Sequence, residues 1–447
     1  MRAALLALLL VAACGPVTGP GRDTPLSPAS LPSVPKTGAA VPAGGTAYDN
    51  RSLARLFTAL THDLEWGASR PHLVRYEAPV NVAVSGPGSE HYTRFTDLYL
   101  AELRARAKID IARAPGPANL HIRFVEGRRF DATFPGISCL VAPGDLDWEA
   151  FRRDPDTLGG RGLETGREQV QTTIFIPQTA PPFLVRSCLL EEIAQALGPA
   201  NDLYELGNSI FNDDAAHLWP TRLDYLMLEV LYRPELRTGL SRQKTEAAAF
   251  RVLEAINPEG RDAPPIRFAA PRGLRGWRTQ HQEIFSSSSS GRRSMKAARS
   301  ASALAAQKAP GSAHHCHSLR TLGRVLAREA PGEALGVLRE AARICAAAHG
   351  PDDIRLSLIA LERAIALHRQ GSHRLVVREL TTHETKLAGY GHEERLAALY
   401  NLRANAYLAL QQGAKSFADR RLAREWAAYA YGRDSEILAR MDEAEGG

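Results

Sequence analysis

The strongest candidates for a chemical centre in this sequence lie between Cys188 and Leu240. Glu191 and Gln195 are four positions apart, which places both side chains on one face of a helix, and Glu192 is adjacent. Two side chains at this spacing can hold a metal ion from a single helical turn. An acidic and amide-rich stretch follows, from Asn201 to Asp214. The pattern predicts either a metal-dependent centre or the remains of one.

Two stretches carry a family resemblance. Residues 188–198 read CLLEEIAQALG and residues 209–213 read SIFND. Together they resemble the bacterial family called domain of unknown function 2927, over roughly residues 70–240. More distantly, the layout resembles that of metzincin zinc peptidases. In those enzymes a helix with HExxHxxGxxH precedes a Ser-Ile-Met turn and a closing helix.

The metzincin resemblance assigns roles by position. Glu191 and Gln195 stand where the two helical histidines would be, and Asn201 where the third zinc ligand would be. Glu192 takes the place of the catalytic glutamate. Gly198 corresponds to the turning glycine, Phe211 to the methionine of the turn, and the closing helix carries Asp224, Leu228, Leu231 and Tyr232.

The ligand chemistry departs from that pattern. Zinc favours imidazole, thiolate and carboxylate, and a carboxamide oxygen is a poor ligand. Without tightly held zinc, a bound water is not acidified and Glu192 has no proton to remove. We therefore expect no cofactor and an inactive, metzincin-like domain. If the protein is an enzyme, Glu191 and Glu192 are the candidate catalytic residues of an atypical metal-dependent hydrolase.

Calcium is a second possibility for this stretch, because it accepts carboxylate and amide oxygens. The simpler interpretation is that Glu191 and Glu192 are helix-surface charges and that the Asn and Asp residues form turns and caps. The oxygens that calcium would draw on belong to Glu191, Glu192, Asn201, Asp202, Asn212, Asp213 and Asp214.

The N-terminus predicts export. Arg2 precedes the apolar run from Ala3 to Val11, which is far shorter than the ~20 residues that span a membrane. Val11-Ala12-Ala13-Cys14 resembles a lipobox, so we expect residues 1–13 to be a signal peptide and Cys14 to be lipidated. An ordinary secretory signal is the alternative. Residues 14–46 are rich in Pro, Gly, Ser and Thr and are expected to form a disordered tether. Gly15 favours the outer membrane, with the protein facing the periplasm.

Five cysteines are present, and four remain once Cys14 is lipidated. An even number in an oxidising compartment predicts disulfides. Three pairings are possible, and Cys139–Cys188 and Cys316–Cys345 are favoured because each falls within one expected domain. The run His314-His315-Cys316-His317 resembles a metal site but lacks a matching partner motif, so metal binding there is not expected.

The net charge of +6 is concentrated in one segment. Eight basic residues and one acidic residue lie between Pro271 and Pro310, so the rest of the chain is nearly neutral. In an exported protein such a basic stretch is expected to stay solvated, with contact to anionic lipid or peptidoglycan as the alternative, rather than to bind nucleic acid. No nucleic-acid partner is predicted.

Strand and helix patterns predict an α+β domain over residues 47–255. Apolar residues at helical spacing indicate helices at 48–66, 90–107 and 183–197, and alternation indicates strands at 79–84, 119–125 and 171–177. Residues 139–142 form a less regular piece. Residues 256–312, with the run Ser286 to Ser290, are predicted to be a low-complexity basic linker.

Residues 313–447 are predicted to be all-α helical repeats. His349-Gly350, Tyr390-Gly391 and Tyr431-Gly432 recur at 41-residue intervals, and Gln370-Gly371 and Gln412-Gly413 fall between them. Repeats of this length built from two helices resemble tetratricopeptide repeats. A plain helical bundle is the alternative.

Two classes of function compete. The first is a membrane-anchored envelope lipoprotein that acts as a non-catalytic binding or scaffold protein, with the repeats contacting a protein or peptide partner. The second is an atypical metal-dependent peptidase. The repeats favour the first, because solenoids present a continuous binding surface rather than a reactive centre.

Overall fold

The computed structural model describes residues 48–64, 67–114, 116–134, 136–155, 170–212, 214–265, 275–285 and 291–432. The predicted signal peptide, the lipidation site Cys14, the tether and Asp213 lie outside the described residues.

A five-stranded sheet forms the centre of the N-terminal region, in the order β2-β1-β3-β5-β4. β1, β2, β3 and β5 run parallel, and β4 pairs antiparallel with β5 at one edge. The expected strands are present, and the irregular piece near Cys139 is in fact a regular edge strand. The strands are β1 (Val80–Ser85), β2 (Ile111–Arg113), β3 (Leu120–Val125), β4 (Leu140–Pro143) and β5 (Thr172–Pro177).

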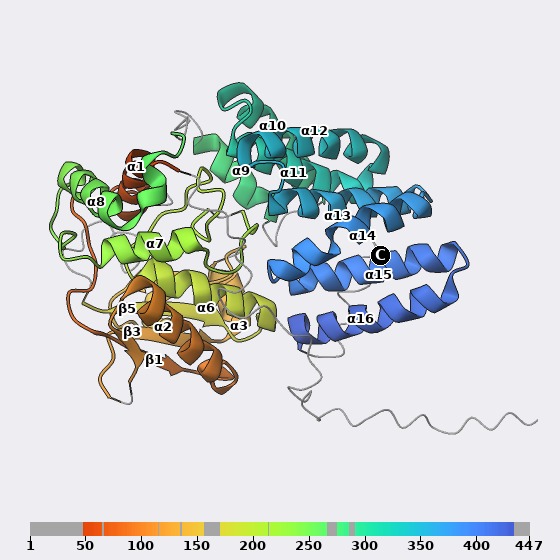
Figure 1. Ribbon diagram of the computed structural model, residues 1–447. Coiled ribbons are helices and arrows are strands. Elements are labelled where there is room, and N and C mark those ends of the chain that lie inside the picture. The colour runs from red at the N-terminus through yellow and green to blue at the C-terminus, as the bar shows by residue number, and fades with distance from the viewer. Residues whose placement is uncertain are drawn as a thin grey trace, which may run out of the picture.

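Helices cover this sheet, as Figure 1 shows. The first begins after Asp49, whose side chain accepts hydrogen bonds from the N–H groups of Arg51 and Ser52. The helices of this region are α1 (Asn50–His62), η2 (Ser89–Tyr92), α2 (Thr93–Ala107), α3 (Gly127–Thr133), α4 (Trp148–Phe151), α6 (Pro182–Ala196), α7 (Arg222–Leu231), α8 (Arg242–Ile256) and η4 (Pro258–Arg261).

Helix α6, which carries Glu191 to Gln195, starts at Pro182 and stops before Gly198. Proline suits the first turn because its missing N–H would have no partner there. Gly198 has φ of 145°, and a Cβ on it would lie 2.7 Å from Leu231 Cδ2 and 3.0 Å from the Val74 carbonyl oxygen. Only glycine therefore fits at this position, where the chain leaves α6 and passes close to Leu231 of α7.

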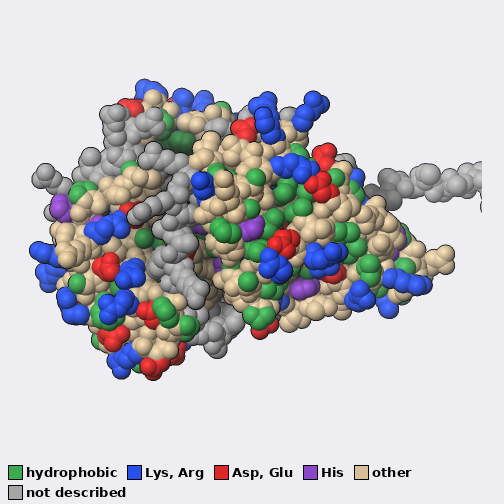
Figure 2. Space-filling model, turned by 90° about the horizontal axis from the view of Figure 1, so that it is seen from above, with side chains coloured by type: hydrophobic (Ala, Val, Ile, Leu, Met, Phe, Trp, Pro, Cys, Tyr) green, Lys and Arg blue, Asp and Glu red, His purple; other side chains and the backbone are tan. Residues whose placement is uncertain are grey.

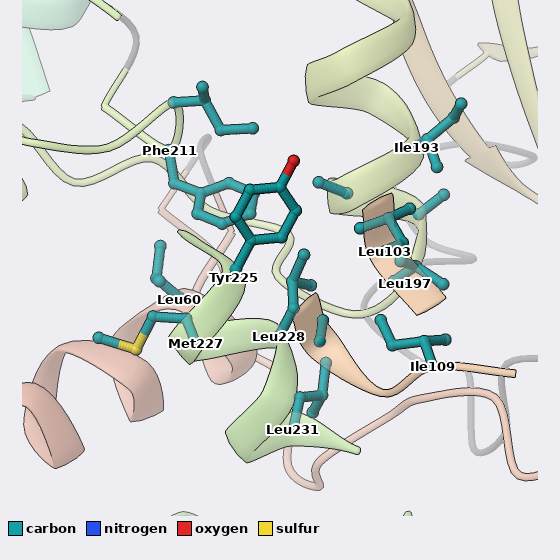
Figure 3. Close-up of a cluster of buried hydrophobic side chains, with 14 of the residues drawn as sticks. Leu60, Leu103, Ile109, Ile193, Leu197, Phe211, Tyr225, Met227, Leu228 and Leu231 are labelled. Carbon is teal, nitrogen blue, oxygen red and sulfur yellow. The ribbon is translucent and has the colours of Figure 1, made fainter. Parts of the chain in front are cut away.

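The core of the N-terminal region holds these helices together. Figure 3 shows Leu228 and Leu231 of α7 pointing toward Ile193 and Leu197 at the end of α6. Phe211, which precedes α7, also enters this cluster and is fully buried. The chain from α6 to α7 is thus fixed by packing on both sides.

The C-terminal region is all-helical, and it starts earlier than the sequence indicates. Parts of the predicted linker form α9 and α10, of which α10 packs on α11. The reason lies in α10, whose alanines at 297, 298, 301 and 305 make a buried stripe with helical spacing. The helices are α9 (Arg275–Phe285), α10 (Gly291–Lys308), α11 (Ala313–Glu329), α12 (Pro331–His349), α13 (Ile354–Arg369), α14 (His373–Gly389), α15 (Glu393–Ala409) and α16 (Gly413–Tyr431).

The 41-residue recurrence marks equivalent turns. Helices α12, α14 and α16 each end at one of the repeated pairs. Gly350, Gly391 and Gly432 have positive φ angles of 102°, 70° and 78°, a conformation that favours glycine. The helices on either side of the Gly350 and Gly391 turns, α12 with α13 and α14 with α15, pack as neighbours along the stack in Figure 1.

Both favoured disulfides are present. Cys139 pairs with Cys188 and joins the start of β4 to α6, while Cys316 pairs with Cys345 and joins α11 to α12. Among the described helices, none has the length and apolar character needed to cross a membrane.

Candidate binding cleft

A cleft of about 1960 Å³ brings together the singled-out residues of α6 and residues of the helical region. Glu191, Glu192 and Gln195 line it, as their common helix face predicts. Asn201 and Asp202, from the segment that follows α6, line it too. The structure therefore gathers most of the predicted oxygen-bearing residues at one place.

The two amides at the cleft are engaged inside the protein. Gln195 Nε2 donates to Asp202 Oδ1 at 3.3 Å, and Asn201 Nδ2 donates to the Ala59 carbonyl oxygen at 3.3 Å. Glu192 is only 6% exposed, whereas Glu191, the residue before it, is half-buried. The positions that correspond to zinc ligands thus hold one carboxylate and two amides that are hydrogen-bonded to their own chain.

The Asp224 carboxylate holds the turn at Ser209 to Phe211. Asp224 of α7 accepts hydrogen bonds from the Ser209 hydroxyl and from the N–H groups of Ile210 and Thr221. Burial raises the pKa of Asp224 to about 6, although these hydrogen bonds act in the opposite direction. Phe211 itself points into the core and not into the cleft.

The other predicted calcium oxygens are divided between different partners. Asn212 Nδ2 donates to the Leu206 carbonyl oxygen at 3.1 Å. Asp214 Oδ2 accepts a hydrogen bond from Arg355 Nε at 2.6 Å. Asn212 and Asp214 both line the cleft, but they bind different parts of the protein. In the described part of the chain, no three His, Cys, Asp or Glu side chains are grouped so that they could hold a metal ion.

The helical region contributes its own wall to the cleft. His281 of α9 and His314 and His317 of α11 line the cleft beside Trp277, and Tyr204 reaches them from the N-terminal region. The ring centroids of Tyr204 and His317 are 5.1 Å apart, and those of His281 and His317 are 4.7 Å apart. Burial lowers the pKa of His281 to about 3 and that of His314 to about 4.

This histidine wall was not predicted as part of the site. The run at residues 314–317 was visible in the sequence, but its middle cysteine is committed to the disulfide with Cys345. The signal that could have revealed the wall is the helical spacing of His314 and His317, which places both rings on one face of α11.

Arginines complete the wall. Arg320 and Arg324 of α11 and Arg395 of α15 line the cleft together with Glu394. Arg320 Nη2 donates to the Asp214 carbonyl oxygen at 3.0 Å, and burial lowers the pKa of Arg324 to about 10. The cleft therefore has a wall of histidine and arginine from the helices, while α6 and the segment that follows it contribute carboxylates. Arg55, Arg70 and Arg242 of the α/β unit line it too.

The repeat turns dock on the loop between α6 and α7. The Arg355 guanidinium, at the start of α13, binds the Asp214 carboxylate and donates to the Gly207 carbonyl oxygen at 2.8 Å. His392 Nε2 lies 3.0 Å from the Ala216 carbonyl oxygen, and a Cβ on Gly391 would lie 2.2 Å from Trp219 Nε1. The edge of the repeats that carries the 41-residue turns is thus occupied by the protein's own N-terminal region.

A second contact holds the C-terminal helices α15 and α16 against α6. Arg186 of α6 donates to Glu393 Oε1 at 3.4 Å and to the Tyr429 carbonyl oxygen at 3.2 Å. Burial raises the pKa of Glu393 to about 7, although the Arg186 cation acts in the opposite direction. The rings of Phe183 and Tyr431 meet edge to face at 5.6 Å. The two regions therefore share one continuous interface.

The protein thus consists of two regions, an α/β unit and a stack of helices that packs against it, and both regions line the cleft. The model of one family, described as protein of unknown function (DUF2927), matches residues 50–250. This range covers the α/β unit up to α8. No curated protein matches the chain, and no solved structure matches it.

Proposed function

We propose that this protein is a membrane-anchored envelope lipoprotein that binds a partner without catalysing a reaction. In this proposal the α/β unit is a metzincin-like domain that has lost its activity. The tetratricopeptide-like helices form the second half of the binding surface. The observation that carries the proposal is the shared cleft, in which Glu191 and Gln195 face a wall of histidine and arginine.

The donor chemistry supports binding over catalysis. Helix, Ser-Ile-Phe turn and closing helix follow one another and pack together in the order that the metzincin resemblance implies. The ligand positions, however, carry Gln195 and Asn201, whose amides donate to the protein itself. Phe211 replaces a methionine and packs into the core. In this proposal the α/β unit keeps the order of a metzincin scaffold and differs from it in the chemistry at its centre.

Opposite charges on the two walls indicate the character of the ligand. A ligand that spans the cleft meets carboxylates on α6 and guanidinium groups on α11 and α15. Charged groups of both signs select partners and fix their orientation. A protein or peptide segment with cationic and anionic side chains has this chemistry.

The test is photocrosslinking from inside the cleft of the full-length, membrane-anchored protein. A photoreactive residue at Gln195 is expected to capture an envelope partner. The same residue at Leu98, which is exposed on α2 and does not line the cleft, serves as the matched control. Capture of one partner from both positions, or from neither, contradicts the proposal.

The alternative function is an atypical metal-dependent peptidase that uses Glu191 and Glu192. The observation that favours it is that both carboxylates line the cleft beside Asp202. Metal analysis of the purified protein together with hydrolysis of an unstructured protein separates the two functions. Stoichiometric metal and hydrolysis, both lost in Glu192→Gln, would establish the enzyme and overturn the non-catalytic proposal.

The location in the envelope has its own test. Cys14→Ser is expected to release the protein from the membrane fraction and to abolish incorporation of labelled palmitate. A protein that is exported by an ordinary secretory signal would fractionate identically with and without Cys14. Separation of inner and outer membranes then decides which of the two holds the protein.

A further inference from the structure

The end of the helical repeats that faces away from the α/β unit differs from the docked end. It is formed by the turns between α13 and α14 and between α15 and α16, which we call the distal tip (residues 366–378 and 405–421). In Figure 1 the turn between α15 and α16 stands at the right-hand edge of the molecule, away from the sheet. The distal tip is therefore the part of the helical stack that projects outward.

Large apolar side chains are exposed on this tip. Phe417 is 75% exposed, Leu408 is 56% exposed and Leu375 is 39% exposed. Leu408 lies in the last turn of α15 and Phe417 in the second turn of α16, on either side of the connection between them. Leu375 lies in the first turn of α14, at the same end of the stack. Only six large apolar side chains in the described part of the chain are exposed, and half of them are here. Such a cluster marks a contact surface.

The charges around these side chains are almost all positive. The distal tip contains six Arg or Lys residues and a single acidic residue, Asp419. Both oxygens of Asp419 accept from Arg403, at 2.6 and 3.0 Å, and its side chain is buried. It therefore does not neutralise the exposed cations at Arg374, Arg378 and Lys415. Figure 2 shows Lys and Arg side chains at this right-hand end of the molecule.

We propose that the distal tip binds the surface of an anionic membrane. Exposed aromatic and aliphatic side chains enter the boundary between headgroups and acyl chains, and the surrounding cations bind acidic headgroups. A second copy of the chain is disfavoured as the occupant because it would bring two basic tips together. The proposal does not depend on the lipid at Cys14, which would be a separate attachment.

The geometry supports this assignment. The tip lies at the opposite end of the helices from the turns that dock on Asp214 and Trp219. Membrane contact through the tip therefore leaves both the interface and the cleft undisturbed. It would also fix the direction in which the cleft faces relative to the membrane.

The test uses the full chain with Cys14→Ser, so that only the tip can attach. Co-sedimentation is measured with vesicles of phosphatidylcholine alone and with vesicles that contain one-third phosphatidylglycerol. Binding to the anionic vesicles and its loss at high salt are expected. The pair Leu408→Ser with Phe417→Ser should weaken binding by about tenfold or more, because each side chain loses its apolar burial. Arg374→Glu with Lys415→Glu should weaken it by about tenfold.

The control is Leu98→Ser, because Leu98 is 55% exposed, as Leu408 is, but lies on α2. It should bind anionic vesicles as the parent does. Equal binding to both kinds of vesicle, or unchanged binding after the tip substitutions, overturns the proposal. Self-association that the Leu408 and Phe417 substitutions abolish, without vesicle binding, would instead assign the tip to a second copy. Unaltered circular dichroism of the variants shows that folding is not the cause.

Discussion

Asp224 shows how a single buried carboxylate organises the chain between α6 and α7. It is fully buried and receives hydrogen bonds from the Ser209 hydroxyl, the Ile210 N–H at 3.2 Å and the Thr221 N–H at 2.6 Å. The last of these also completes the capping box at the start of α7. One residue thus ties the Ser-Ile-Phe turn to the helix that follows it.

Asp224→Ala is expected to destabilise the protein by about 3 kcal/mol. The substitution leaves several buried donors without an acceptor, and each such group costs about 1–3 kcal/mol. Urea unfolding monitored by circular dichroism measures the change. Asp131→Ala, on the exposed face of α3, is the control and should change the free energy of unfolding by less than about 0.5 kcal/mol. Equal stability of the two variants would show that Asp224 does not hold the turn.

The sequence predicted the identity of several site residues but not what they contact. The four-residue spacing of Glu191 and Gln195 predicted a shared helix face, and both residues lie on α6 and line the cleft. It could not show that Gln195 donates to Asp202 or that Asp214 faces Arg355, because the latter contact joins residues 141 positions apart. Local periodicity carries no information about partners at such separations.

At the scale of elements, the repeated turns have different surroundings despite their similar sequences. Gly371 and Gly391 have nearly equal φ angles of 72° and 70°. A Cβ on Gly371 would meet nothing within 4 Å, whereas one on Gly391 would lie 2.2 Å from Trp219 Nε1. Alanine at Gly371 therefore tests the cost of the backbone conformation alone, whereas alanine at Gly391 tests that cost together with the clash against Trp219.

Gly371→Ala is expected to cost about 1 kcal/mol, because alanine is strained at positive φ. Gly391→Ala should carry the same strain and a further cost of about 1–3 kcal/mol from the clash with Trp219. Thermal unfolding of the two variants beside the parent measures both terms. In a Trp219→Ala background the clash is absent, so Gly371→Ala and Gly391→Ala should lower the free energy of unfolding by similar amounts. Equal costs in the parent background would mean that this turn does not dock.

Element boundaries illustrate where sequence patterns fail. The short strand β2 was not predicted, since three residues give no alternation to recognise. The helix α10 was hidden within a basic, serine-rich segment, although its alanines bury one face. By contrast, α6 and β5 were predicted closely, because prolines mark the start of α6 and β-branched and aromatic residues mark β5. Short elements and small-residue cores are thus decided by tertiary packing rather than by local pattern.

At the scale of the whole molecule, the buried ion pair of Arg355 and Asp214 joins the two regions, as does that of Arg186 and Glu393. Arg355 is 1% exposed and binds Asp214, which is also buried. Burial alone would raise the pKa of Asp214, but the guanidinium groups of Arg355 and Arg320 hold it well below its usual value. The pair therefore couples α13 to the loop that lines the cleft.

Arg355→Met is expected to destabilise the protein by about 3–5 kcal/mol, because it leaves the Asp214 carboxylate buried without its partner. Asp214→Asn should cost less, because Arg355 keeps the Asp353 carboxylate, both of whose oxygens lie 3.0 Å from Arg355 Nη1. The double variant should cost less than the sum of the two single variants, which a double-mutant cycle measures by urea unfolding. Strictly additive costs would show that the two side chains do not act as a pair.

Histidines at the same interface predict how the assembly responds to acid. Burial, together with nearby cations, lowers the pKa of His217 and of His349 to about 3, and burial lowers the pKa of His314 to about 4. His217 and His349 face Arg355 and Asp214, and His314 faces Arg278 and Glu205. These rings are neutral in the folded protein at a pH where they would be protonated in the unfolded chain.

The unfolded chain therefore binds more protons below about pH 6.5, so stability is full above that pH and falls as the solution becomes more acidic. At pH 5 each of the three rings contributes a loss of up to about 2 kcal/mol. Measurements between pH 7.5 and 5 avoid the range in which Asp214 titrates in the unfolded chain, near pH 4. Glu393 and Asp224, whose pKa values in the folded protein are raised to about 7 and about 6, take up protons in this window and offset part of the loss. Urea midpoints at the two values should differ strongly in the parent and less in His217→Asn, because one of the titrating groups is gone. An equally steep dependence in that variant would show that His217 is not buried as a neutral ring at the interface.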